Sequence, residues 1–211
     1  GERKMALFFC FSMFLGAALQ LTNMYGDTFL KDFGNVVEYK NSAVVQYSTM
    51  IISISQISET LFILAIPFFL YKFGIKKVML ISMVAWVLRF AFFSFGEPQG
   101  FGLMLIIFSN IIYGMAFDFF NISGSLFVET TTDSKIRSSA QGLFMMMTNG
   151  FGAILGSTLS GIIIGKFFTD ANGFKEWGGI WLTFTIYALV VTVFFALLFK
   201  HKHNDAEVAQ I

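Results

Sequence analysis

The stretch SISQISETLF, residues 53–62, places an ionisable side chain inside a long apolar segment. The segment runs from about Ser42 to Tyr71, and Glu59 lies well inside it. A segment of this length and composition is typical of a helix that spans a membrane. A carboxylate is costly in lipid and is rare there unless it faces a cavity or a partner. Glu59 is therefore the first candidate for a functional residue.

The composition of the whole chain is typical of a membrane protein with several helical spans. Hydrophobic residues make up 56% of the 211 positions and charged residues 13%, and the mean hydropathy is +0.72. Soluble domains usually carry about twice that charged fraction. Apolar runs of about 20 residues must be helical to satisfy their backbone in lipid. The net charge of +1 gives no indication of a nucleic-acid partner.

Short polar connections divide the chain into six apolar segments. We expect one all-α domain over residues 1–211, with membrane spans at 5–34, 42–71, 78–95, 103–128, 142–167 and 180–199. Six spans place both termini on one side of the membrane. Nine of the 14 Lys and Arg residues fall on that side, four fall on the other, and Arg89 lies within the membrane. The positive-inside rule therefore predicts cytoplasmic termini. Because the chain begins with Gly1 rather than Met, we expect it to be part of a longer protein.

Polar residues recur in pairs within the first, second and fourth segments. Residues three apart share one face of a helix. Counted at about 1.5 Å per residue, Glu59, Asp118 and Arg89 fall in the middle or inner part of a core about 30 Å thick. Amides and carboxylates there can bind a ligand rich in hydroxyls and ring nitrogens, and two carboxylates also suit proton coupling. The pairs are Gln20 and Asn23, Gln56 and Glu59, and Asp118 and Asn121.

Structural roles are also compatible with these residues. Amides in membrane helices often hold neighbouring helices together. Either Glu59 or Asp118 could form an ion pair with Arg89, which lies in the third segment and is expected to be structural rather than substrate-contacting. Phe117 could stack on a ligand or pack with the many neighbouring Phe side chains. In the fifth segment, small residues at a four-residue spacing predict close approach of another helix; they are Gly152 and Gly156.

Longer motifs at these positions are similar to those of a known family. They are LGAALQLTNMYGDTFL from Leu15, SISQISETLFILAIPFFL from Ser53, FGIKKVM from Phe73, YGMAFDFFNISGSLFVE from Tyr113 and SAQGLFMMMTNGFG from Ser139. Together they closely resemble the carboxyl-terminal half of bacterial nucleoside permeases. Those permeases are nucleoside:proton symporters of the major facilitator superfamily.

The resemblance implies a twelve-helix transporter of the bacterial cytoplasmic (inner) membrane, of which this chain is the second six-helix half. Its partners would be a nucleoside such as uridine, a proton, the lipid bilayer and the amino-terminal six-helix half, with no cofactor and no metal. Substrate would bind between the halves and be reached by alternating access. We expect Glu59 or Asp118 to take the coupling proton. Carried over by motif, the substrate-contacting positions are Gln20, Asn23, Gln56, Glu59, Phe117 and Asp118.

Two other functions are compatible with the sequence. One is a sugar:proton symporter of the same superfamily, and the other is a membrane scaffold or receptor that transports nothing. An enzyme is not expected, because the spans contain no His, no metal-ligand cluster and no nucleophile–base pair. His201 and His203 lie in the polar tail and are expected to be solvated rather than to bind a metal.

Overall fold

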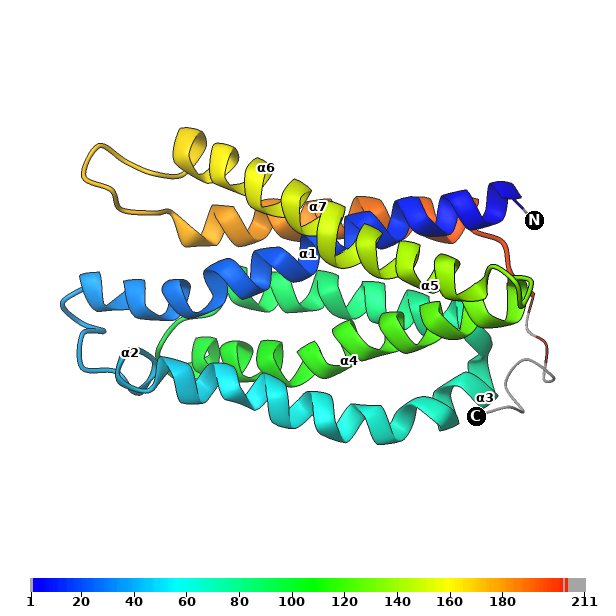
Figure 1. The fold of residues 1–211 in the computed structure, drawn as a ribbon. Coiled ribbons are helices and arrows are strands. Elements are labelled where there is room, and N and C mark those ends of the chain that lie inside the picture. The colour runs from blue at the N-terminus through cyan, green and yellow to red at the C-terminus, as the bar shows by residue number, and fades with distance from the viewer. Residues whose placement is uncertain (1, 203, 205–211) are drawn as a thin grey trace.

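A computed structural model of the chain, which describes residues 2–202 and 204, is a bundle of long helices (Figure 1). No strand occurs among the described residues, so the all-α prediction is confirmed. The elements in order are α1 (Glu2–Asp32), the 3-10 turn η1 (Phe33–Asn35), α2 (Ala43–Gln46), α3 (Ser48–Ser94), α4 (Gly100–Thr131), α5 (Arg137–Met145), the π-helical turn η2 (Met146–Phe151), α6 (Gly152–Phe167) and α7 (Trp177–Leu198).

The 47 residues of α3 form two antiparallel helices rather than one. A straight helix of that length would measure about 70 Å, more than twice the hydrocarbon core of a bilayer. Gly74 has φ 75° and ψ 166°, a conformation that is essentially restricted to glycine. Figure 1 shows the chain turning back at the end of the bundle where α3 is labelled. The connection predicted at residues 72–77 is therefore helical on both sides of this single residue.

Five helical stretches are long and apolar enough to cross a membrane by length and composition, and α3 is one of them. Because α3 turns back at Gly74, the described chain has six membrane-length helices. The stretch from Arg137 to Phe167 combines α5, η2 and α6. It begins five residues before the predicted span at 142. The described part of the chain thus has the architecture of a six-helix bundle.

Two ends of the bundle differ in charge. The start of α1, the turn at Gly74, the link from α4 to α5 and the end of α7 lie together (Figure 1). This end carries the nine basic residues that the sequence assigned to the side of the termini.

The tail residue His201 differs from its expected solvated state, because its Nδ1 lies 2.5 Å from Lys4 Nζ and its ring packs edge-on against Phe127. His203 lies outside the described residues.

Glycines bring α1 into backbone contact with η2 and α6. A Cβ on Gly152 would lie 2.6 Å from the Met13 carbonyl oxygen, and one on Gly156 would lie 2.7 Å from the Ala17 carbonyl oxygen. On the α1 side, a Cβ on Gly16 would overlap the carbonyl of Thr148. The close approach predicted from the glycine spacing is therefore confirmed. It fixes the first turns of α6 against the middle of α1.

Candidate functional site

The six predicted contact residues come from α1, the first half of α3 (residues 48–73) and α4. Asp118 is buried, with 5% of its surface exposed. Gln20, Glu59 and Phe117 are half-buried, whereas Asn23 and Gln56 are exposed on the surface of the bundle. No hydrogen bond joins any two of these six side chains in the described structure. The five polar side chains among them thus have donors or acceptors available to a ligand.

Hydrogen bonds hold the first half of α3 against α4. Ser55 Oγ donates to Asn110 Oδ1 at 2.8 Å, and Asn110 Nδ2 donates to the Ile106 carbonyl at 2.9 Å. Ser58 Oγ donates to the Ile111 carbonyl. These three serine and asparagine positions lie on the helix faces in contact. Asn110, a polar residue within the fourth span, therefore joins helices rather than facing a ligand.

Gly114 places Glu59 beside α4. A Cβ at position 114 would lie 2.6 Å from the Glu59 backbone nitrogen, so no larger residue fits there without movement. Asp118 follows Gly114 by four residues, which is about one helical turn. The two carboxylates therefore belong to neighbouring turns of one interhelical contact.

Asp118 is the buried acid of the site. Its Oδ2 atom is buried and has no hydrogen-bond partner within the described part of the chain. Buried polar atoms are normally hydrogen-bonded, and each exception calls for an explanation such as a bound group, a water or a catalytic role. In a site that binds a polar ligand or a proton, this oxygen would be the acceptor. Glu59 likewise has no hydrogen bond or ion pair among residues 2–202 and 204.

A small pocket lies between α4 and α1. Its walls include Leu15 and Leu19 of α1 and Phe117 and Asn121 of α4. Leu19 immediately precedes Gln20 in the chain, so the α1 pair begins one residue beyond this pocket. Since Gly114 joins α4 to α3, helix α4 is the element that connects the three predicted polar pairs.

Tyr113 lies beside the predicted site, and the sequence reasoning missed it. Its ring lies parallel to the Phe117 ring, with an interplanar angle of 7° and a centroid distance of 6.0 Å. The guanidinium carbon of Arg89 lies 4.7 Å from the Tyr113 centroid on α4. The spacing of four residues between Tyr113 and Phe117 was the available signal, because such positions are neighbours on a helix. Tyr113 supports the orientation of the Phe117 ring.

Arg89 is bound by neutral oxygens instead of by a carboxylate. Its Nε donates to Thr22 Oγ1 at 3.1 Å, and a terminal nitrogen donates to the Ser109 carbonyl at 2.6 Å. Ser109 Oγ donates in return to the Arg89 carbonyl at 2.9 Å. In the described structure no ion pair joins Arg89 to Glu59 or Asp118. The ion-pair alternative for Arg89 is therefore corrected: the side chain, 1% exposed, joins α1, α3 and α4.

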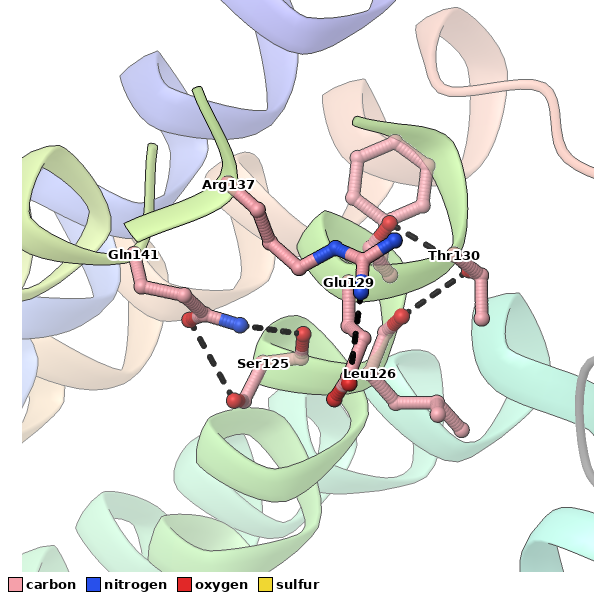
Figure 2. Close-up of polar contacts among 7 residues, drawn as sticks. Ser125, Leu126, Glu129, Thr130, Arg137 and Gln141 are labelled. Atoms are coloured by element: carbon pink, nitrogen blue, oxygen red, sulfur yellow. Dashed lines mark hydrogen bonds and ion pairs between the residues drawn. The ribbon is translucent and has the colours of Figure 1, made fainter. Parts of the chain in front are cut away.

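A polar stripe continues from the site along α4 towards the end of the bundle near the termini. Asn121, Ser125 and Glu129 follow at spacings of four residues and line a cleft of about 420 Å³ with Gln141 of α5. Figure 2 shows Gln141 bound twice to Ser125. Gln141 Nε2 donates to the Ser125 carbonyl at 2.8 Å, and Ser125 Oγ donates to Gln141 Oε1 at 3.2 Å. Glu129 lies 3.9 Å from Arg137 in a half-exposed ion pair.

Six membrane-length helices, with polar and acidic side chains on three neighbouring ones, define the class of multi-pass helical membrane proteins. The profile of the nucleoside H+ symporter family matches residues 1–204. The chain belongs to this family.

Individual relatives agree with this assignment. The nucleoside permease NupG of Escherichia coli (strain K12) is 55% identical over 202 residues, which cover 96% of this chain and 48% of the permease. The xanthosine permease of the same organism is 54% identical over 205 residues, which cover 97% and 49%. A crystal structure of the nucleoside transporter NupG matches with a TM-score of 0.88 at 55% identity and covers 95% of this chain and 49% of that chain. The chain thus spans about half the length of the relatives it matches.

Proposed function

We propose that this chain supplies one half of a transporter that moves nucleosides across a membrane together with protons. The proposed activity is transport rather than catalysis. The observation that carries it is the arrangement of three polar pairs on α1, α3 and α4, in a chain of the nucleoside H+ symporter family. The relatives named for nucleosides and xanthosine favour a nucleoside over a free sugar.

The polar side chains suit the two chemical parts of a nucleoside. The amides of Gln20, Asn23 and Gln56 each offer donors and an acceptor, which match the edges of a base and the ribose hydroxyls. Glu59, as an acceptor, would bind ribose hydroxyls or a base N–H group. The Phe117 ring, held parallel to Tyr113, would stack on the base, since every base has a π face.

Glu59 and Asp118 are the proposed proton carriers. They are the carboxylates that lie in the middle of the predicted spans, and ionisable residues at that depth mark proton relays in many transporters. The buried Oδ2 atom of Asp118, without a partner among the described residues, can accept a proton and then donate it in a hydrogen bond. A proton on either group would remove a charge that is costly in a low-dielectric site.

The remaining partners follow from the length and charge of the chain. In a full-length transporter about twice this size, a second six-helix half would face the exposed Asn23 and Gln56 and complete the site. The positive-inside rule assigns the basic end of the bundle, with both termini, to the cytoplasm. The membrane would be the bacterial inner membrane.

Proton-driven uridine uptake by the full-length transporter tests the proposal. We expect Glu59→Gln or Asp118→Asn to abolish accumulation against a gradient, while the exposed control Glu38→Gln accumulates as the parent does. Full accumulation by both site variants would contradict the coupling assignment. Competition by free ribose or by disaccharides as strong as that by nucleosides would contradict the substrate class.

A further inference from the structure

A groove lies on the surface of the bundle between the second half of α3 (residues 75–94) and α4. It has a volume of about 440 Å³. Val84 and Leu88 are 47% and 38% exposed, so the groove opens to the surroundings. None of its lining residues belongs to the polar pairs. Six of them define its course: Lys77, Leu80, Val84, Leu88, Ile112 and Met115.

The groove has a charged mouth and an apolar floor. Lys77 is exposed at the end of the bundle that carries the turn at Gly74, and it forms no hydrogen bond or ion pair within the described residues. The nearby Lys76 Nζ donates to the Ala196 carbonyl of α7 at 3.0 Å. Lys72 Nζ lies 5.4 Å from the centroid of the Phe73 ring, which also lines the groove. Lys77 thus places an ammonium group at the mouth, and Lys72 lies beside a ring that lines the groove.

The length of the groove matches one leaflet of a bilayer. Lys77 and Leu88 are 11 residues apart on one helix, which corresponds to about 16 Å. Half of a hydrocarbon core about 30 Å thick is about 15 Å. The groove therefore runs from the interface at Lys77 to the middle of the membrane at Leu88.

The charge at the mouth selects among lipid headgroups. No acidic residue occurs between Glu59 and Glu97, so neither helix segment that flanks the turn at Gly74 offers a partner for a cationic headgroup. A zwitterionic lipid would bring its ammonium group close to Lys77. A lipid with a net negative charge would meet only complementary charge there, and each Lys near such a surface adds to the attraction.

We propose that this groove holds an acyl chain of an anionic glycerophospholipid whose phosphate binds Lys77. The chain fills the space between Val84 of α3 and Ile112 and Met115 of α4. The lipid thereby covers apolar surface on the second half of α3 and on α4, the helix that carries Asp118. The site is independent of the transported substrate, so its test does not rest on the proposed function.

Native mass spectrometry of the full-length transporter, titrated with phosphatidylglycerol or phosphatidylcholine, tests the proposal. We expect one phosphatidylglycerol to be retained in preference to phosphatidylcholine. Lys77→Gln should weaken the retention of phosphatidylglycerol about fivefold, while Lys135→Gln, an exposed lysine at the same end, should leave it unchanged. Equal retention of the two lipids, or equal retention by the two variants, would overturn the proposal.

A second pair of variants tests the apolar part of the groove. Val84→Trp fills the groove and should remove retention of both lipids, whereas Val193→Trp places the same ring at a 48% exposed position of α7 and should not. Unchanged retention by Val84→Trp would show that the acyl chain lies elsewhere. The Lys77→Gln comparison alters no packing and decides the question even where Val84→Trp fails to fold.

Discussion

Gly114 of α4 lies so close to Glu59 of α3 that a Cβ at position 114 would be 2.6 Å from the Glu59 nitrogen. The same Cβ would be 2.7 Å from the Ser58 carbonyl oxygen. The missing side chain is therefore what allows the two helices to meet at the depth of the acidic residues. The position of the Glu59 carboxylate relative to Asp118 depends on this contact.

Replacing Gly114 should disturb stability and substrate binding together. Gly114→Ala forces α3 and α4 apart, and overpacking of this kind typically costs about 1–3 kcal/mol. We expect a lower unfolding temperature and weaker uridine binding in the full-length transporter. Gly161→Ala is the matched control, because a Cβ there meets no atom within 4 Å. Equal behaviour of the two variants would show that the helix contact does not set the site.

Arg89 should be required for stability in a way that lysine cannot replace. Its guanidinium bonds to Thr22 and Ser109 in two directions, and a lysine ammonium has neither the reach nor the planar fork to do both. Losing one charged hydrogen bond should cost about 2 kcal/mol of unfolding free energy. Thermal unfolding of Arg89→Lys measures this cost. Arg137→Lys, in a half-exposed ion pair, should change stability by less than about 0.5 kcal/mol, and similar shifts in the two variants would contradict this account.

The ring of Phe117 should contribute to nucleoside affinity. Base stacking on an aromatic side chain is worth about 1–3 kcal/mol, so Phe117→Leu should weaken uridine binding roughly tenfold or more. Calorimetry on the full-length transporter measures the loss. Phe108→Leu changes an exposed ring on the same helix and should leave affinity unaltered. If Phe117→Leu binds uridine as tightly as the control does, the ring packs against protein only.

The double hydrogen bond between Gln141 and Ser125 should hold α5 against α4. Gln141→Ala removes both bonds, so we expect faster amide hydrogen exchange across residues 137–145. Exchange in α6 should stay slow, because its glycines hold it against α1. Gln99→Ala, at an exposed position near the other end of the bundle, is the control. Exchange that rises equally in α5 and α6 would mean that the two helices move as one unit.

Much of this architecture follows from sequence patterns that reflect strong physical constraints. Long apolar segments must be helical in lipid, so six helices could be predicted from hydropathy alone. The spacing of Gly152 and Gly156 predicted close packing, which the contacts with Met13 and Ala17 confirm. Glu59 and Asp118 were identified because carboxylates at such positions are costly. The role of the polar pairs in binding is still a prediction.

Other features depend on tertiary contacts that no local pattern encodes. The partners of Arg89 are a threonine hydroxyl and a backbone carbonyl. The ion pair with a carboxylate that its charge suggested is therefore not formed in the described structure. Asn110 resembles the other amides in sequence, yet its bond to Ser55 assigns it to helix packing. The reversal of α3 needs only Gly74, because one glycine conformation replaces the longer connection that hydropathy predicted.

The central claim is that nucleoside and proton move together through a site that includes Glu59 and Asp118. Proteoliposomes of the full-length transporter, with external pH recorded on addition of uridine, test it most directly. We predict that the external medium becomes more alkaline as uridine enters, and that ribose causes no change. The double variant Glu59→Gln, Asp118→Asn should show no pH change. Uridine entry without proton movement, or an unaltered pH change in the double variant, would contradict the claim.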